Sequence, residues 1–335
     1  MTPKSTPNEE RGNEASRRPI LLDVTLRDGG YVNDHRWSVD EASSVVRAVE
    51  EARIPFVEVG YLRTPTGNAL CPAARCEPDY LRTLAAEVHR TRLAVMVRPG
   101  EVDPAALAPL GDLGVGLVRV LAPGLDLVPA LPYLAAARDA GLLTAVNLTH
   151  TSRADPARLA LAVSRAAQAG AGLVYLADSN GSLYPEDVTR RVSAAVHAAT
   201  EQGPGPVIGF HAHDNLGLAF ANSCAALDAG ATALDASIGG IGKGGGNLRL
   251  ELIAAHLTLH LGADFSLDPL VKDQSTVSTR IRMLAEFSAE NVLSGLLDVS
   301  LDQSRLLREQ TARHGYDALL RGQSVLETSQ VAGQV

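Results

Sequence analysis

The feature that most constrains the fold is a regular alternation of short apolar runs with stretches of helical period. Eight runs have the length and composition of buried strands: Leu21–Thr25, Phe56–Gly60, Leu93–Val97, Leu117–Leu121, Leu142–Leu148, Leu173–Ala177, Val207–His211 and Ala233–Ser237. Helical patterns lie between them, at Val39–Ala52, Pro78–His89, Leu131–Ala140, Pro156–Gln168, Pro185–Ala199 and Leu216–Ala229. Eight such units over roughly 245 residues predict a (β/α)₈ TIM barrel rather than a doubly wound sheet.

The same pattern divides the chain into four parts. We expect the barrel over residues 19–265, preceded by a disordered leader at 1–18 that lacks the apolar segment of a signal peptide. Further helical patterns at Pro269–Leu284, Ala289–Leu296 and Gln303–Leu320 predict a small C-terminal helical region over 266–321. Residues 322–335 are expected to form a flexible tail.

Composition excludes several functions. The net charge is −8 and no basic stripe occurs, which argues against nucleic acid or an anionic membrane as partner. No apolar run reaches the ~18 residues that a membrane span needs. Three cysteines, Cys71, Cys76 and Cys224, have no metal-binding spacing and are expected to be small buried side chains. We therefore expect a cytoplasmic protein in a reducing compartment.

Polar residues gather where the predicted strands end. They are Arg27 and Asp28, then Arg98, then Asn147 with Thr149 and His150, then Asp178, and finally His211 and His213. A TIM barrel carries its chemistry at the carboxyl ends of its strands, so this series predicts an active-site mouth.

The run His211-Ala212-His213 is the strongest local signal for a metal. Residues two apart on a strand project from the same face, so both imidazoles can reach one divalent ion. A distant carboxylate such as Asp28 would complete a site of two histidines and one acid with open positions for substrate. The alternative is a hydrogen-bonded pair of core histidines.

Two glycine-containing loops follow predicted strands. Asp28-Gly29-Gly30 could be an ordinary turn, but Arg27 before it would hold a positive charge beside a metal. The loop Gly239–Asn247 satisfies GxGxxG only formally, because it follows the last strand rather than the first, and it lacks the Ser or Thr of a Walker loop. We expect the amides of Gly245 and Gly246 to approach an anionic substrate, and Asn247 to close over the metal.

The positions of the lysines argue against covalent catalysis through a lysine imine. Its three lysines, Lys4, Lys243 and Lys272, all lie outside the predicted strands, whereas an imine-forming lysine must be desolvated. No GxSxG nucleophile motif occurs either. The electron sink is therefore expected to be a metal ion. His150, at the end of a strand, is a candidate for proton transfer.

Three separated motifs resemble those of the DRE-TIM metallolyases, the superfamily that includes 3-hydroxy-3-methylglutaryl-CoA lyases. They are Asp23–Gly29, His211–Ala219 with Asn222, and the loop that ends at Gly246-Asn247. Within that superfamily the chain looks most similar to the 4-hydroxy-2-oxovalerate aldolases. The resemblance implies that Asp28, His211 and His213 hold Mn²⁺ or Mg²⁺, with Co²⁺ or Zn²⁺ as other ions, and that Arg27 is catalytic.

The resemblance further implies a class II aldolase that makes or cleaves the carbon–carbon bond between pyruvate and an aldehyde, with an acylating aldehyde dehydrogenase as partner. We also expect a homo-oligomer. Two departures concern proton transfer: Tyr31 stands where those aldolases carry a base histidine, and Gly295–Ser300 has no tyrosine, Tyr316 being a weak substitute. Tyr31 and His150 are the preferred base candidates, ahead of His35. A Claisen-type synthase that condenses acyl-CoA with a 2-oxo acid, a non-catalytic barrel subunit and, last, a mononuclear iron oxygenase are the alternatives.

Overall fold

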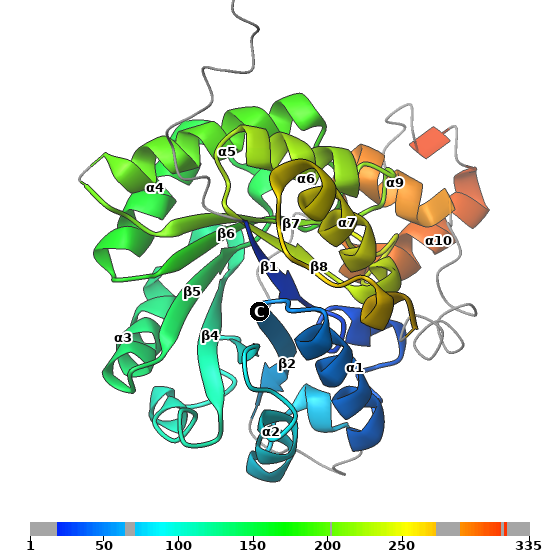
Figure 1. The fold of residues 1–335 in the computed structure, drawn as a ribbon. Coiled ribbons are helices and arrows are strands. Elements are labelled where there is room, and N and C mark those ends of the chain that lie inside the picture. Colours follow the sequence, from blue (N-terminus) through cyan, green and yellow to red (C-terminus); the bar gives the residue numbers. More distant parts are fainter. Residues whose placement is uncertain (1–18, 64–70, 202, 273–288, 316–317, 320–335) are drawn as a thin grey trace, which may run out of the picture.

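The computed structural model describes residues 19–63, 71–201, 203–272, 289–315 and 318–319. Within them, eight parallel strands close into a barrel in chain order, with β8 paired to β1 (Figure 1). The strands are β1 (Ile20–Asp23), β2 (Phe56–Leu62), β3 (Arg92–Val97), β4 (Val115–Ala122), β5 (Leu143–Leu148), β6 (Leu173–Asp178), β7 (Val207–Ala212) and β8 (Ala233–Ala236). Each overlaps a predicted strand, so the TIM barrel is confirmed.

Helices form the outer ring: α1 (Val39–Glu51), α2 (Pro78–Ala85), α3 (Leu131–Asp139), α4 (Pro156–Gln168), α5 (Pro185–Thr200), α6 (Ala219–Asp228) and α7 (Leu250–Leu261). The first six correspond to predicted helices, whereas α7 was not predicted. Gly141, Gly170 and Gly230 adopt positive φ where helices end, as their place before the next strand predicts. Between β3 and β4 the chain forms only the short 3₁₀ turn Pro104–Leu107.

The predicted C-terminal helical region contains α9 (Ala289–Leu297) and α10 (Ser304–His314), drawn in orange to red beside the barrel in Figure 1. Asp298 attaches this region to loops at the carboxyl ends of the strands, because its Oδ1 accepts hydrogen bonds from Asn180 Nδ2 at 2.6 Å and Ser182 Oγ at 3.1 Å. Residues 268–272 begin the predicted helix Pro269–Leu284, whose remainder lies outside the described residues. So do Lys4 and Tyr316, the leader at 1–18 and the tail at 322–335.

The barrel interior is built in layers. A floor of apolar side chains comes from the first half of each strand and includes Phe56, Leu117 and Ala233. Two residues further along the same strands, and therefore on the same inward face, the side chains are Glu58, Arg119 and Asp235, all at most 1% exposed. The layer between the floor and the mouth is thus charged rather than apolar.

No helix in the described part of the chain is long and apolar enough to cross a membrane. Cys76 is buried as predicted, while Cys71 and Cys224 are only partly buried.

Candidate active site

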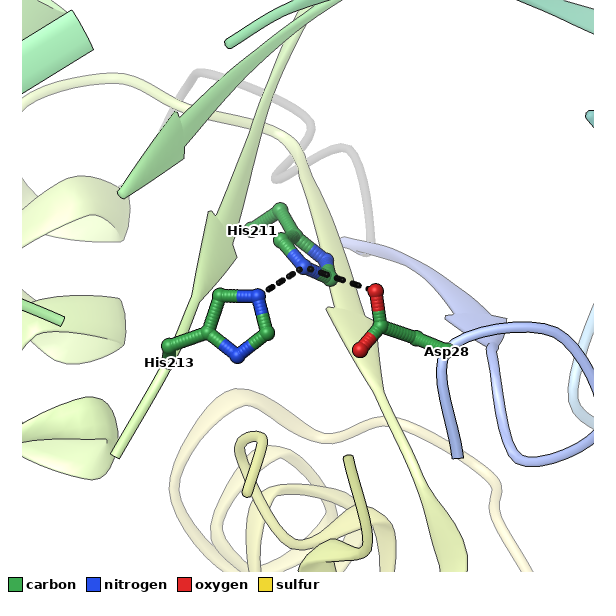
Figure 2. A group of neighbouring side chains, drawn as sticks. All are labelled: Asp28, His211 and His213. Atoms are coloured by element: carbon green, nitrogen blue, oxygen red, sulfur yellow. Dashed lines mark hydrogen bonds and ion pairs between the residues drawn. The ribbon is translucent and has the colours of Figure 1, made fainter. Parts of the chain in front are cut away.

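Asp28, His211 and His213 meet at the mouth of the barrel, as Figure 2 shows. Each is at most 5% exposed, and their ligand atoms lie within 4.8 Å of one another. His211 Nε2 is 3.4 Å from His213 Nε2 and 3.6 Å from Asp28 Oδ2. These spacings suit ligand atoms that each lie about 2.1 Å from one ion. The predicted convergence of these three residues is therefore present.

Hydrogen bonds on the far side of each ring determine which nitrogen faces the cluster. Asp235 Oδ2 accepts from His211 Nδ1 at 2.9 Å, and the Gly246 carbonyl accepts from His213 Nδ1 at 3.2 Å. When both rings are neutral, both Nε2 atoms therefore present lone pairs to each other and to the Asp28 carboxylate. Three lone pairs that face one another without a proton between them fit a cation, so the donor set could hold a divalent metal.

Charges around Asp28 keep its carboxylate ionised and in place. Burial alone would raise the pKa of Asp28, but attraction by the Arg27 guanidinium, helped by the hydrogen bond from Asn247, acts in the opposite direction, and the pKa lies far below its usual range. Arg27 NH1 bonds to Oδ2, while Asn247 Nδ2 donates to Oδ1 at 3.2 Å. Asn247 thus lies beside the cluster, as predicted, and orients the carboxylate.

Close backbone approach explains the glycines of these loops. A side chain at Gly30 would collide with the His35 ring, whose Nε2 donates to the Arg27 carbonyl at 2.8 Å. A side chain at Gly246, where φ is 98°, would collide with the Gly240 carbonyl. Both loops therefore pack tightly enough to hold Arg27 and His213 in position.

A buried charge network links Arg27 to His211 through residues that the sequence reasoning missed. Arg27 Nε donates to Glu58 Oε2 at 2.6 Å, and Arg119 NH1 donates to the same oxygen at 3.1 Å. Arg119 NH2 donates at 2.5 Å to Asp235 Oδ2, the oxygen that also accepts from His211. The sequence did offer a signal for this network: Glu58, Arg119 and Asp235 each interrupt an otherwise apolar strand. Buried charges require partners, so such residues indicate an interior ion-pair network.

The base candidates differ in their surroundings. Tyr31 and His150 both line the cavity of about 570 Å³ that contains the cluster of Asp28, His211 and His213. The Tyr31 hydroxyl lies 2.9 Å from the Tyr61 hydroxyl, whereas His150 Nδ1 is buried without a partner among the described residues. Burial lowers the pKa of His150, so its ring is neutral and able to accept a proton. His35 is absent from the cavity lining and is instead bonded to the Arg27 backbone.

Three other predicted site residues lie outside the lining of this cavity. Asp178 accepts hydrogen bonds from the amides of Ser182 and Leu183, so its carboxylate stabilises the turn after β6. Gly245 donates its amide to Asn215 Oδ1 at 2.6 Å, and the Gly246 carbonyl holds His213. The structure thus gives these glycines contacts with protein groups rather than with the cavity.

Comparison with known proteins assigns the family. The HMGL-like family model matches residues 130–280. A 4-hydroxy-2-oxovalerate aldolase of Spirochaeta aurantia is 36% identical over 252 residues, which cover 72% of this chain and 71% of that protein. The chain belongs to the HMGL-like family. An oxaloacetate decarboxylase of Mycobacterium tuberculosis is 33% identical over 243 residues, which cover 72% of this chain and 70% of that protein.

Membership of the HMGL-like family confirms the resemblance stated from the motifs. The chain is accordingly an enzyme related to carbon–carbon lyases, and a non-catalytic barrel is not supported. The fold also matches the N-terminal domain of a candidate aldolase from Bacteroides vulgatus, with a TM-score of 0.79 at 23% identity, covering 90% of this chain and 99% of that one.

Proposed function

We propose that this protein is a divalent-metal-dependent aldolase that makes or cleaves the carbon–carbon bond between pyruvate and an aldehyde. The observation that carries the proposal is the convergence of Asp28, His211 and His213 beside Arg27 in one cavity. A divalent ion held there, Mn²⁺ or Mg²⁺ by preference and Co²⁺ or Zn²⁺ otherwise, would act as a Lewis acid on a 2-oxo acid.

Arg27 is placed to stabilise negative charge on the keto oxygen. Burial alone would lower the pKa of Arg27, but Glu58 and Asp28 outweigh it and raise the pKa well above its usual value, so the guanidinium stays charged. Its Nε and NH1 are occupied by these two carboxylates, while no described residue accepts a hydrogen bond from NH2. That nitrogen is therefore available to the oxygen that becomes negative when the bond breaks.

His150 is the preferred base for aldol cleavage. It would take the proton of the substrate hydroxyl as the adjacent carbon–carbon bond breaks, the aldehyde leaves, and the electron pair moves into the pyruvate enolate. Protonation of the enolate carbon completes pyruvate. Tyr31 is less suited, because its hydroxyl is already hydrogen-bonded to that of Tyr61.

A second candidate is decarboxylation of oxaloacetate. It is favoured by the Mycobacterium tuberculosis relative and by the chemistry of the cavity, since loss of CO₂ forms the same enolate without removal of a hydroxyl proton. Arg27 would have the same role in both reactions. The cytoplasmic location, the homo-oligomer and the acylating aldehyde dehydrogenase partner remain predictions.

Exchange of the pyruvate methyl protons in D₂O, followed by NMR, tests the half-reaction that both candidates share. We expect exchange that depends on added Mn²⁺ or Mg²⁺ and is abolished in Asp28→Ala. Asp34→Asn is the matched control, because Asp34 is exposed in the same loop. Full exchange in Asp28→Ala would refute the proposed site.

The products then separate the reactions. Acetaldehyde from 4-hydroxy-2-oxovalerate supports the aldolase, and CO₂ from oxaloacetate without aldol cleavage supports the decarboxylase. Free thiol released from an acyl-CoA would instead indicate the Claisen-type synthase.

A further inference from the structure

The cavity is larger than the proposed reaction needs with a small aldehyde. An adduct of pyruvate and acetaldehyde has about nine non-hydrogen atoms, or roughly 270 Å³ if each takes the ~30 Å³ of a liquid water molecule. The cavity among the described residues measures about 570 Å³. Space therefore remains for an acceptor with a longer chain.

The additional space has an apolar wall. Met96 on β3, Leu121 on β4, and Pro123 and Pro129 after β4 line the cavity. These strands are adjacent, and they are separated from β7, which carries His211, by β5 and β6. A methylene chain attached to the aldehyde carbon can lie along this wall.

Arg98 lies at the outer end of the same wall. It follows β3 directly, two residues beyond Met96, and it lines the cavity with a side chain that is 44% exposed. Its one ion-pair partner in the described part of the chain is Glu101, at 3.6 Å from Nε, and Glu101 is bound more closely by Arg63 Nε at 2.7 Å. Asp302 also lines the cavity, but its carboxylate is bound by Lys243, and Arg98 contributes only the last of the effects that lower its pKa. No described residue accepts a hydrogen bond from the Arg98 guanidinium.

The other cations of the cavity already have close partners. Arg27 bonds to Asp28 and Glu58, and Lys243 Nζ lies 2.5 Å from Asp302 Oδ1. Among the described cations that line the cavity, Arg98 is thus the one whose guanidinium makes no hydrogen bond to the protein. A single guanidinium matches a carboxylate best, because two parallel N–H groups can bond to its two oxygens.

We infer that the acceptor aldehyde carries a terminal carboxylate, and that Arg98 binds it. This inference rests on the proposed aldolase function. It makes Arg98 a specificity-determining residue on the side of the barrel opposite β7, which carries His211.

Condensation of pyruvate with butanal and with 4-oxobutanoate tests the inference, since both aldehydes have four carbons and only the second ends in a carboxylate. We expect kcat/KM to be about tenfold higher for 4-oxobutanoate, mainly through a lower KM. Arg98→Gln should remove this preference, so that kcat/KM for 4-oxobutanoate falls to about the value for butanal. Arg92→Gln is the matched control, because Arg92 is an exposed arginine at the opposite end of β3.

Pyruvate methyl exchange, measured on the same preparations, distinguishes an error in the role of Arg98 from an error in the proposed function. Normal exchange with equal kcat/KM for the two aldehydes, or a preference that survives in Arg98→Gln, would overturn the role of Arg98 alone. Absence of exchange in the wild type would overturn the proposed function, and this inference with it.

Discussion

Asp235 offers the sharpest test of how the barrel interior supports the proposed metal site formed by Asp28, His211 and His213. Its Oδ2 accepts from both His211 Nδ1 and Arg119 NH2, at 2.9 and 2.5 Å, whereas its Oδ1 has no partner among the described residues. Asp235→Ala leaves the His211 N–H without an acceptor, so the ring can change tautomer or rotate. Loss of such a partner typically weakens metal binding 10–100-fold, or about 1.4–2.7 kcal/mol.

Asp235→Asn should have a smaller effect, because the amide oxygen can take the place of Oδ2 and the amide nitrogen that of the unpartnered Oδ1. The cost is then the difference between a charge-assisted and a neutral hydrogen bond, about 1 kcal/mol, or roughly fivefold. Calorimetric titration of metal-free protein with Mn²⁺ measures both effects, and Asp228→Ala, an exposed residue of α6, serves as control. Thermal melting without metal checks that each variant is folded. Wild-type affinity in a folded Asp235→Ala protein would refute the reasoning.

Three further predictions follow from the site and its surroundings. Arg27→Lys should keep Mn²⁺ binding but slow pyruvate exchange about 10²–10³-fold, since lysine lacks the guanidinium fork; unchanged exchange would remove Arg27 from the mechanism. His150→Gln should slow cleavage of 4-hydroxy-2-oxovalerate by about 10²-fold or more and spare decarboxylation of oxaloacetate, and equal losses in both assays would contradict its role as base. Burial raises the pKa of Asp178 to about 6, so the folded state binds this proton more tightly than the unfolded state. The stabilisation that comes from protonated Asp178 should be complete below about pH 4 and lost as the pH rises through 6. The fall in Tm between pH 5 and pH 8 should therefore be smaller in Asp178→Asn than in the wild type. Equal falls in the two proteins would disprove the raised pKa of Asp178.

The barrel could be predicted because parallel strands covered on both faces form nearly continuous apolar runs. Positive-φ glycines such as Gly141 and Gly170 mark where each helix ends before the next strand. Helix α7 escaped prediction because its sequence, LELIAAHLTLHL, is apolar on almost every side and so lacks a clear polar face. Local pattern therefore predicted the strands better than this last helix of the barrel.

The convergence of Asp28, His211 and His213 could be predicted for a similar reason. His211 and His213 are two apart on one strand, and the carboxyl ends of all strands meet at one mouth, so Asp28 is brought near them by the fold itself. The interior network could not be predicted in this way. Arg119 bonds to Glu58 and Asp235, which are 61 and 116 residues away, and these pairings depend on the register of the closed barrel.

That network is better explained by positioning than by stability. Replacing buried ion pairs with apolar side chains of similar volume is often neutral or stabilising, so a layer that contains Glu58, Arg119 and Asp235 is not needed to hold the barrel together. The two ends of the network, Glu58 and Asp235, instead contact Arg27 and His211, whose orientation the proposed chemistry requires. Glu58 holds the Arg27 guanidinium, Asp235 fixes the tautomer of His211, and Arg119 joins the two carboxylates. Because these contacts form one continuous chain, a displacement of Arg119 would disturb Arg27 and His211 together.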